Sequence, residues 1–413
     1  MQHKDCVSVT KCRLCVSKKL KKVLNLGVSP LANSYSKNIQ KKIKKYPLQL
    51  NLCMQCGHLQ LGHSINPRLM FSNYLYQTNT SKKNYFHFKN YAQKIIKLKK
   101  KKFKILDIAS NDGTFLSFFK KKNFCLGIDP AKNLKKIAEK NGITQIADFF
   151  TYRKSNNIKK VFGNFDIITA NHVCAHVENL HDFFTGVKNL LKDDGFFIFE
   201  VSYRGSVLKK NTFDTIYHEH MDYHALKPVE NFSKKFDFQI FDFEITEAQG
   251  GSLRVFLTSI NNTVPKKNLK KIKKFIDKEK KINQLFDLKK YLDFKKRIDS
   301  ARFKLHRIIT KLRKKNLIIA GYGAAAKTTT FLNYFRIKDE IVKFIIDDNK
   351  LKHNLYIPGR KIKIENAKKL KEVKIDILII FAWNYSEYII KKNKPYKEMG
   401  GKFIIPFPDP KLV

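Results

Sequence analysis

Four short apolar runs alternate with helical segments between residues 103 and 201, and this alternation limits the possible folds more than any other feature of the sequence. The runs read FKILDIA, FCLGID, FDIITA and FFIFEV, and segments such as NLKKIAEK and NLHDFFTGVKNLL lie between them. Alternation of this kind produces a parallel sheet with crossover helices. Because helices cover both faces of such a sheet, its strands are apolar throughout. The sequence therefore predicts a central α/β domain.

The C-terminal part of the chain begins a second unit of the same kind. A strand, NLIIAGYG, is followed by a helix, KTTTFLNYF, and by another strand, VKFIIDD. Gly321, Gly323 and Ala326 have nearly the spacing of the dinucleotide fingerprint, and Asp347 ends the second of these strands. Taken alone, this pattern indicates an NAD site.

A lysine-rich segment, residues 264–315, separates the two units. Apolar residues recur in it at helical spacing: Leu269, Ile272, Phe275, Ile276, Ile282, Leu285 and Phe286. This pattern predicts an amphipathic helical connector with solvated lysines, and a basic arm for nucleic acid is the alternative. Since 413 residues exceed what one core usually organises, we expect several domains. Their predicted limits are 1–75, 76–263, 264–315 for the connector and 316–413.

Four cysteines near the N-terminus form two C-x-x-C pairs, Cys12 with Cys15 and Cys53 with Cys56. Two such pairs can present four thiolates tetrahedrally to Zn²⁺. A C-x-x-C pair can also serve in redox chemistry, but the presence of two pairs favours structural zinc. With sulfur at all four positions, no coordination site stays open for chemistry. The long stretch between the pairs predicts a small lobe folded around the metal.

The first strand of the central domain leads into a turn of small residues. Asp107, Ala109, Asn111 and Gly113 follow the D-x-G-x-G-x-G spacing of methyltransferases, with two glycines replaced. The next strand ends in Asp129, which can accept hydrogen bonds from both hydroxyls of a ribose. A later segment, LLKDDGFFIFEV, resembles the late helix, turn and strand of methyltransferases. This ordered set favours S-adenosylmethionine (SAM) over a dinucleotide, and an ordinary βα turn is the alternative.

The chain carries a formal net charge of +48, from 83 Lys and Arg against 35 Asp and Glu. Such a charge would suit nucleic acid or an anionic membrane surface, but the lysines are spread along the chain as short pairs, which indicates compositional drift. No run of 18 apolar residues is present, and the first residues lack the apolar stretch of a secretory signal. We therefore expect a cytoplasmic protein, monomeric or weakly dimeric, with no specific nucleic-acid partner and no membrane contact.

Residues 217–224 read YHEHMDYH, which gathers three histidines, two tyrosines, a glutamate and an aspartate into eight positions. This density of titratable groups is compatible with a metal site, an acid/base centre or a hydrogen-bonded polar turn. On the residues alone the polar turn is favoured. Zinc is less suited to this segment, because the four cysteines already supply a complete site.

Taken together, these segments resemble the SAM-dependent sugar C-methyltransferases that act on nucleotide-linked 4-keto deoxysugars. The resemblance runs nearly end to end, through CRLC, LNLGVSPLANSY, YPLQLNLCMQCGHLQL, YLYQTNTS, DIASNDG, GIDPAKN, AHVENLHDF, DTIYHEHMDYHAL, GGSLRVF, GYGAAAKTTTFLNYF and FAWNYSEYI. It implies a zinc-binding N-terminal lobe, a class I methyltransferase (Rossmann-like) core and a Rossmann-like C-terminal domain. In the family this last domain supports the substrate site and transfers no hydride, which makes NAD binding the less favoured interpretation here.

The resemblance also implies roles for single residues. The zinc ligands are Cys12, Cys15, Cys53 and Cys56. The cofactor positions are Asp107, Asn111, Gly113 and Asp129, and we place Ala109 with them. The catalytic loop corresponds to 217–220, where His220 is the general base beside Tyr217 and Glu219, and His218 is left undecided. We interpret 222–224 as structural.

Further positions of the active site follow from the same resemblance. His176 in CAHV matches another active-site histidine, and Tyr74 and Tyr76 match tyrosines near the sugar. Members commonly have Asn-Asn where this chain has Asn171-His172, so His172 indicates a different substituent pattern or stereochemistry of the sugar. Lys327 is a candidate for a nucleotide phosphate by its charge and placement.

The expected reaction is methylation of a nucleotide-linked 4-keto sugar at C3 through an enolate. A histidine that titrates near neutrality suits removal of the C3 proton, and a tyrosine or second histidine can donate to the developing oxyanion. The alternatives are a zinc-ribbon RNA or DNA methyltransferase, which the positive charge would suit, and a nonenzymatic nucleotide-sugar binding module.

Overall fold

The computed structural model describes residues 5–40, 42–71, 78, 82–99 and 101–413. The chain forms two compact units, each made of discontinuous segments. The first contains the segments up to Lys21, Asn51–Ser206 and His220–Phe286; the second contains Lys22–Leu50, Val207–Glu219 and Asp287–Val413. The four predicted domain limits stay a prediction. The division between the units passes through the YHEHMDYH segment.

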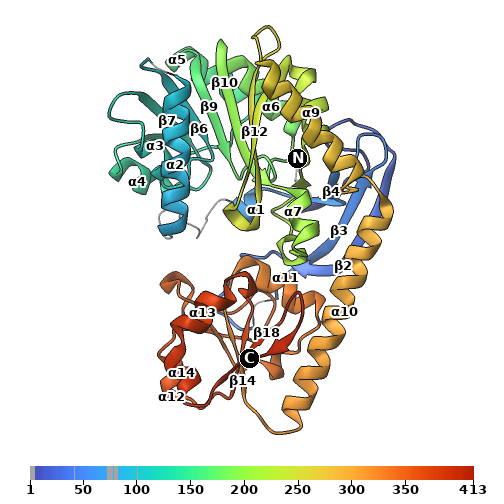
Figure 1. Cartoon of the computed structure of the whole chain (residues 1–413). Coiled ribbons are helices and arrows are strands. Elements are labelled where there is room, and N and C mark those ends of the chain that lie inside the picture. The colour runs from blue at the N-terminus through green and yellow to red at the C-terminus, as the bar shows by residue number, and fades with distance from the viewer. Residues whose placement is uncertain (1–4, 41, 72–77, 79–81, 100) are drawn as a thin grey trace. The chain divides into compact units, whose positions relative to one another are not determined.

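A seven-stranded sheet forms the centre of the first unit (Figure 1). Its strands are β6 (Lys104–Ile108), β7 (Phe124–Ile128), β8 (Thr144–Ile146), β9 (Phe165–Asn171), β10 (Leu191–Ser202), β12 (Phe238–Thr246) and β13 (Ser252–Ser259). Their order is β12-β13-β10-β9-β6-β7-β8. Strands β6 to β10 pair in parallel, and β13 is antiparallel to both of its neighbours. The predicted α/β fold class is confirmed.

The order of the strands places a topological switch point between β6 and β9, because the chain proceeds from β6 in one direction and from β9 in the other. Ligands of open α/β sheets bind at such points, outside the carboxyl ends of the strands. Asp107 lies in β6, and Asn171 ends β9. The fold therefore brings the predicted cofactor turn to the edge where ligands bind.

Helices cover both faces of this sheet (Figure 1). On one face lie α2 (Lys82–Leu98), α3 (Thr114–Ser117) and α4 (Lys132–Lys140), whose apolar residues share a core with Ile105, Ile167 and Ile198. On the other lie α5 (Tyr152–Phe162), α6 (Leu180–Leu190) and α8 (Leu226–Ser233). Phe184 of α6 packs there on Phe197 of β10, with the ring centroids 5.4 Å apart. The central strands β6 and β9 are almost wholly buried, as their unbroken apolar sequence predicts.

Short strands complete the N-terminal part of the chain. Strand β1 (Cys6–Ser8) pairs with β5 (His63–Ile65), and β4 (Leu59–Leu61) pairs with β11 (Asp222–Tyr223), both antiparallel. The sheet β11-β4-β3-β2 also contains β3 (Lys45–Cys53) and β2 (Leu20–Pro30). Two short helices are also present. Helix α1 (Arg68–Phe71) follows β5 in the chain, and α7 (Arg204–Lys209) follows β10.

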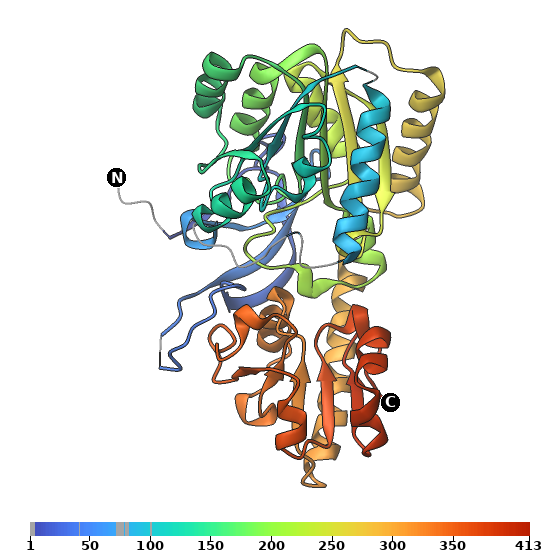
Figure 2. The same cartoon turned by 90° about the vertical axis from the view of Figure 1, so that its left-hand side faces the viewer.

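A second doubly wound sheet forms the centre of the second unit (Figure 2). Its order is β16-β15-β14-β17-β18-β19, with a switch point between β14 (Ile319–Tyr322) and β17 (Ile377–Ile380). The other strands are β15 (Ile345–Ile346), β16 (Ile364–Glu365), β18 (Lys402–Ile405) and β19 (Lys411–Leu412). Its helices are α10 (Leu288–Arg313), α11 (Ala326–Tyr334), α12 (Lys369–Glu372), α13 (Ser386–Lys392) and α14 (Lys394–Glu398). The predicted C-terminal Rossmann-like fold is present.

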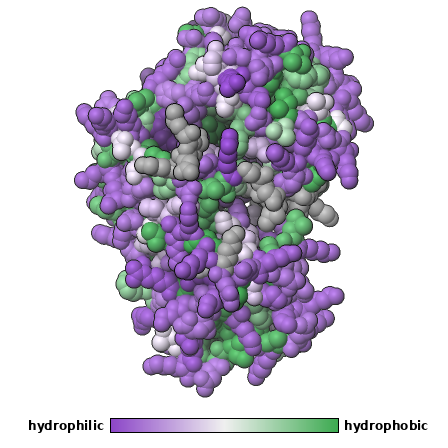
Figure 3. All heavy atoms as spheres, turned by 180° about the vertical axis from the view of Figure 1, so that it is seen from behind, coloured by the Kyte–Doolittle hydropathy of each residue, from purple (hydrophilic) through white to green (hydrophobic). Residues whose placement is uncertain are grey.

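The predicted connector consists of two helices, α9 (Lys266–Lys281) and α10. The side chain of Asp287 caps α10 by accepting a hydrogen bond from the Lys289 N–H at 2.9 Å. Ile272 and Leu285 are buried as predicted, but Leu269 and Ile282 are 47% and 69% exposed, so their assignment to an apolar face is wrong. Hydrophilic side chains cover most of the face in Figure 3. Among the described helices, none is long and apolar enough to span a membrane.

Candidate active site

The four predicted zinc ligands lie together. The Sγ atoms of Cys12 and Cys56 are 3.6 Å apart, those of Cys15 and Cys53 are 3.5 Å apart, and all four lie within 4.8 Å of one another. A tetrahedral Zn²⁺ with Zn–S bonds of about 2.3 Å requires S···S separations of roughly 3.8 Å. Cys12 and Cys53 are buried. The geometry therefore fits a closed, four-sulfur structural zinc site.

The predicted cofactor turn adopts the backbone geometry of a glycine-rich turn with only one glycine. Ala109, Asn111 and Gly113 all have positive φ, at 61°, 52° and 75°. Side chains other than glycine are uncommon in this region of φ/ψ space. The Asn111 carboxamide Oδ1 accepts hydrogen bonds from the N–H and hydroxyl of Thr78, at 3.0 and 3.2 Å. Asn111 therefore replaces a glycine with a residue that tolerates left-handed backbone and that also fixes a neighbouring segment.

Two buried aspartates flank this turn. Asp129 accepts the N–H of Asn111 at 2.9 Å and that of Ala131 at 2.8 Å, one on each carboxylate oxygen. Each oxygen keeps a second lone pair for a ligand hydroxyl. Asp107 accepts hydrogen bonds from Thr169 at 2.6 Å and Asn171 at 3.2 Å, both on Oδ1. The two carboxylates thus combine ordered positions with remaining acceptor capacity, as a nucleoside ligand requires.

Burial raises the pKa of Asp107 to about 7, against the hydrogen bonds from Thr169 and Asn171, which lower it. Burial also raises the pKa of Asp129. A carboxyl with a raised pKa at the end of a parallel strand is a candidate ligand-binding group, because a bound cation or hydrogen-bond donor would favour its charged form. A cofactor that carries a sulfonium and an amino group fits this environment.

Two of the predicted active-site histidines lie side by side in the first unit. The imidazole rings of His176 and His220 have centroids 5.0 Å apart and are nearly perpendicular, at 74°. The backbone joins the two segments directly, because the N–H of Met221 donates to the carbonyl of Ala175 at 2.7 Å. Both histidines are partly exposed. They form a pair of proton-exchanging groups that a substrate can reach.

The residues just before His220 belong to the second unit. Glu219 is buried and accepts a hydrogen bond from the Asn33 side chain at 2.7 Å. His218 is also buried, and its Nε2 lies 3.3 Å from the carbonyl oxygens of Tyr46 and Pro47. Tyr217 is partly exposed. These contacts favour a structural role for His218, and the role of Tyr217 toward the substrate stays a prediction.

His172 directly follows β9 and lies in a polar cluster. Its Nε2 lies 3.6 Å from Glu200, whose carboxylate also contacts His87 and Arg254, at 3.1 and 2.6 Å. Burial lowers the pKa of His172, although the charge of Glu200 opposes this shift. Burial would raise the pKa of Glu200, but the hydrogen bond to His87 and the charge of Arg254 lower it. His172 is therefore a partly exposed imidazole beside a buried carboxylate that Arg254 and His87 hold in place.

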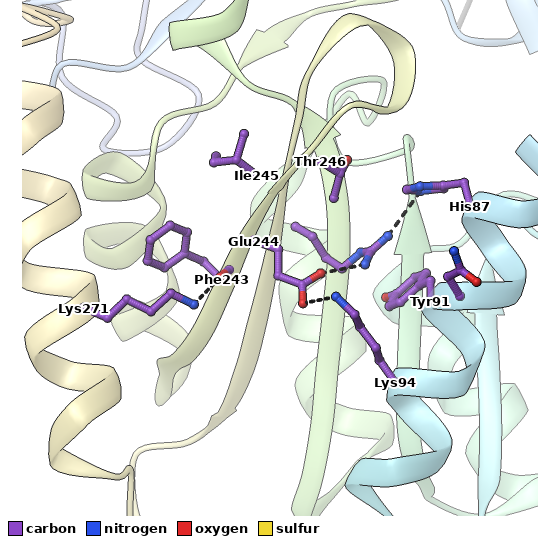
Figure 4. A pocket seen from close by; sticks show the side chains of 10 residues that line it. His87, Tyr91, Lys94, Phe243, Glu244, Ile245, Thr246 and Lys271 are labelled. Carbon is purple, nitrogen blue, oxygen red and sulfur yellow. Dashed lines mark hydrogen bonds and ion pairs between the residues drawn. The ribbon is translucent and has the colours of Figure 1, made fainter. Parts of the chain in front are cut away.

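Sequence reasoning missed this support. Glu200, Arg254 and His87 come from β10, β13 and α2, and no local motif connects them. A pocket of about 480 Å³ lies beside the cluster, lined by α2, β12, Arg254 and Lys271 (Figure 4). Its cations already contact carboxylates: Lys94 and Arg254 pair with Glu244, and Lys271 pairs with Asp242. The only signal in the sequence was the charged residue at the end of an apolar strand, FFIFEV.

Polar groups of the turn after β14 form hydrogen bonds to other residues of the second unit. Asp347 accepts the N–H of Ala324 at 2.7 Å, while Tyr35 and Lys352 donate to the carbonyl of Ala324 at 2.7 and 2.8 Å. Lys327 donates to Asn384 at 2.8 Å, and burial lowers its pKa despite the charge of Asp214. Several polar groups of this turn therefore hydrogen-bond within the unit, while Ala325, Ala326 and Lys327 stay partly exposed.

Two predicted substrate residues, Tyr74 and Tyr76, lie outside the described residues. Thr78, close to them in the sequence, is described and buried. Its contact with Asn111 brings Thr78 to the cofactor turn. No local pattern indicates this contact, because Thr78 and Asn111 are 33 residues apart.

Three family models match the chain in succession. Residues 12–71 match a model described as "Putative zinc binding domain", residues 81–242 match "Methyltransferase domain", and residues 247–408 match "C-methyltransferase C-terminal domain". The zinc match begins at Cys12 and includes all four cysteines of the cluster. Together the three models follow the chain from the zinc lobe to the C-terminal sheet.

The chain is also similar to individual proteins. It is 26% identical to C-methyltransferase NovU from Streptomyces niveus over 417 residues, which covers 98% of this chain and 97% of that protein. Among solved structures, the PH0226 protein from Pyrococcus horikoshii OT3 covers 46% of this chain and 97% of its own, with 19% identity and a TM-score of 0.37. A SAM-dependent methyltransferase from Clostridium acetobutylicum ATCC 824 covers 42% and 92%, with 17% identity and a TM-score of 0.34.

Proposed function

We propose that this chain methylates C3 of a nucleotide-linked 4-keto deoxysugar. The chain belongs to the C-methyltransferase family and is a SAM-dependent C-methyltransferase with a structural Zn²⁺ site. The paired, partly exposed rings of His176 and His220 carry this proposal. Carbon is a poor nucleophile unless a neighbouring carbonyl allows a proton to leave. A 4-keto sugar supplies that carbonyl, and the histidine pair supplies the base.

The cofactor side of the reaction is assigned to the turn after β6. Asp129 would hold the ribose hydroxyls, Asp107 would accept donors of the cofactor through Oδ2, and the left-handed backbone of Ala109, Asn111 and Gly113 would let the ligand approach closely. When bound, SAM supplies an electrophilic methyl group. The residues of the turn contribute order, since alignment of two bound reactants can remove about 7 to 11 kcal/mol from a bimolecular barrier.

The acceptor side is assigned to the histidines and the loop. His220 takes the proton from C3, which leaves an enolate with its charge on the C4 oxygen. Tyr217 or His176 donates a hydrogen bond to that oxygen. Glu219 is fixed by Asn33 and accepts a sugar hydroxyl or orients the loop. His172 would meet a substituent of the sugar, and the roles of Tyr74 and Tyr76 toward the sugar and of Lys327 toward a nucleotide phosphate stay predictions from the sequence.

Mass spectrometry of a panel of nucleotide-linked 4-keto sugars incubated with SAM tests the acceptor. The expected result is a gain of one methylene mass on the sugar of at least one member. In deuterium oxide without SAM, the same sugar should exchange its C3 hydrogen. Methylation of RNA, DNA or a sugar oxygen in place of this product would overturn the proposal.

His220→Ala tests the assignment of the base. The variant should lose the exchange at C3 and the methyl transfer by a factor of about 100 to 10,000, the usual contribution of a general base. SAM affinity should stay unchanged, because His220 does not belong to the cofactor turn. His218→Gln is the matched control for a neighbouring buried histidine and should retain C3 exchange. Full turnover in His220→Ala would contradict the assignment.

His172→Asn tests the predicted determinant of sugar specificity, because it restores the Asn-Asn pair common in the family. The expected result is a changed order of kcat/KM across the sugar panel with unchanged SAM affinity. The change should be about 10-fold or more, since a lost hydrogen-bonding partner alters recognition of a substituent by roughly 1 to 3 kcal/mol. An identical order of preference would remove His172 from the substrate site.

A further inference from the structure

One arginine of the zinc lobe contacts both segments that carry the active-site histidines. Arg13 lies between Cys12 and Cys15, and its side chain is only 8% exposed. Its Nε is 3.0 Å from each carboxylate oxygen of Asp222, which follows His220 by two residues. Its Nη2 donates to the carbonyls of Val177 and Glu178, directly after His176. A single guanidinium therefore joins a zinc knuckle to both histidine segments.

Backbone hydrogen bonds make the same connection. Strand β4 pairs with β11, and Asp222 lies opposite Gln60. The side chain of Gln60 accepts the N–H of Arg13 at 2.8 Å and donates to the carbonyl of Lys11 at 3.1 Å. The carbonyl of Met221 accepts the N–H of Leu61 at 2.8 Å. The first knuckle, β4 and the residues after His220 thus form one continuous hydrogen-bonded structure.

The second knuckle reaches the same carboxylate. His58, two residues after Cys56, is fully buried and places Nε2 2.8 Å from Oδ1 of Asp222. Asp222 is itself 1% exposed. A carboxylate buried to this extent requires partners, and removal of one partner leaves an uncompensated charge. Because both partners come from residues next to zinc ligands, the position of Asp222 depends on the folded state of both knuckles.

We infer that Arg13 and Asp222 are positioning residues for His176 and His220, and that the metal-bound knuckles hold the acid/base pair in its working geometry. The inference rests on the proposed function, from which it takes the roles of the two histidines. The zinc site would then affect the reaction through the positions of the two histidines, although no coordination position of the zinc is open to a substrate. Misplacement of a catalytic group by about 1 Å can cost roughly 100-fold in rate.

Arg13→Lys tests the inference in the full-length, zinc-loaded protein. Lysine keeps the charge, but its ammonium lacks the planar fork that reaches Asp222 and two carbonyls together. We expect kcat to fall about 10- to 100-fold, with unchanged SAM affinity by calorimetry and unchanged zinc content. Arg153→Lys, a change at an exposed arginine of α5, is the matched control and should keep wild-type kcat. Wild-type kcat in Arg13→Lys would overturn the inference.

Asp222→Asn keeps the test decisive if Arg13→Lys loses zinc, because it leaves the knuckle sequence intact. The amide has nearly the shape of the carboxylate but not its charge. We expect a similar loss of kcat with full zinc content, and a double variant whose loss is smaller than the product of the two single losses, since both changes break the Arg13–Asp222 contact. Fully additive losses would show that the two residues act separately and would contradict their joint positioning role.

Imidazole resonances of ¹⁵N-histidine-labelled protein give a measurement that needs no acceptor sugar. The signals of His176 and His220 should shift in Arg13→Lys and Asp222→Asn and stay in place in Arg153→Lys. Unchanged signals in both variants would overturn the positioning role. Absence of sugar methylation by the wild-type enzyme would instead overturn the proposed function and would leave this measurement intact, so the two failures are distinguishable.

Discussion

In both doubly wound sheets, an aspartate after the second strand accepts a backbone N–H from the turn after the first. Asp129 accepts from Asn111 at 2.9 Å, and Asp347 accepts from Ala324 at 2.7 Å. Each aspartate also accepts an N–H two residues further along its own segment, at 2.8 Å in both cases. The two turns therefore share one local design, which is the reason that both resemble nucleotide-binding fingerprints in sequence.

The surroundings of the two turns differ. In the second unit, Tyr35 and Lys352 occupy the carbonyl of Ala324, which is fully buried, and a Cβ added to Gly323 would lie 2.6 Å from that of Ala382. In the first unit Ala109 and Asn111 are partly exposed, as Ala325 and Ala326 are in the second, so the turns differ in the hydrogen bonds and the packing around them. The fingerprint in the sequence thus indicates the backbone geometry of a turn, whereas ligand binding also depends on the residues that surround the turn.

Asp107→Asn would give the largest effect, because burial strongly raises the pKa of this carboxyl beside the cofactor turn. A rise from 3.8 to about 7 corresponds to about 4 kcal/mol between the protonation states. The folded state binds the proton more tightly, so stability is lost as pH rises through 7. We expect the variant without SAM to be more stable than wild type by up to about 4 kcal/mol at pH 8, with the difference shrinking towards pH 4. Calorimetric melting at both pH values measures this, and an equal difference at both would contradict it.

Asp129→Ala and Asp347→Ala test whether the two equivalent aspartates differ in function. Loss of hydrogen bonds to a charged acceptor costs about 1.5 to 3 kcal/mol each, so Asp129→Ala should weaken SAM binding about 100-fold. Asp347→Ala should lower the melting temperature and leave SAM affinity unchanged. Isothermal titration gives both affinities. Equal weakening by the two variants would break the distinction between the turns.

Gly323→Ala tests the closure of the C-terminal turn. The residue has φ at 94°, and its new Cβ would contact Ala382. We expect a loss of about 1 to 3 kcal/mol of stability from strain and overpacking, with no change in SAM affinity. A melting curve and one SAM titration decide this. A variant as stable as wild type would show that the turn has room for a ligand.

Ala109→Gly should give the smallest effect. Alanine at φ 61° is strained by about 1 to 2 kcal/mol, but glycine loses more conformational freedom on folding, at a cost of about 0.5 to 1 kcal/mol. The two contributions nearly cancel, so melting should shift by no more than the equivalent of about 1 kcal/mol and SAM affinity should change less than threefold. A large loss of affinity would show that the methyl group itself contacts the cofactor.

The sequence alone predicted the two sheets, the zinc cysteines and the turn after β6 because each depends on residues close together in the chain. Apolar runs identify strands, C-x-x-C spacing identifies a knuckle, and Asp107 to Gly113 form one turn. The polar cluster of Glu200, Arg254 and His87 was not predictable in this way. Its members meet only because β10 pairs with β13 and α2 covers that face of the sheet.

The segment YHEHMDYH shows both contributions. Its residue types and its resemblance to a family loop determined which chemistry to expect, because titratable side chains in that order are a property of the sequence. The tertiary structure decided the environment of each residue: His218 and Glu219 are buried, His220 lies beside His176, and Asp222 is held by Arg13, 209 residues earlier. Contacts across such distances depend on strand order and burial, which no local pattern encodes.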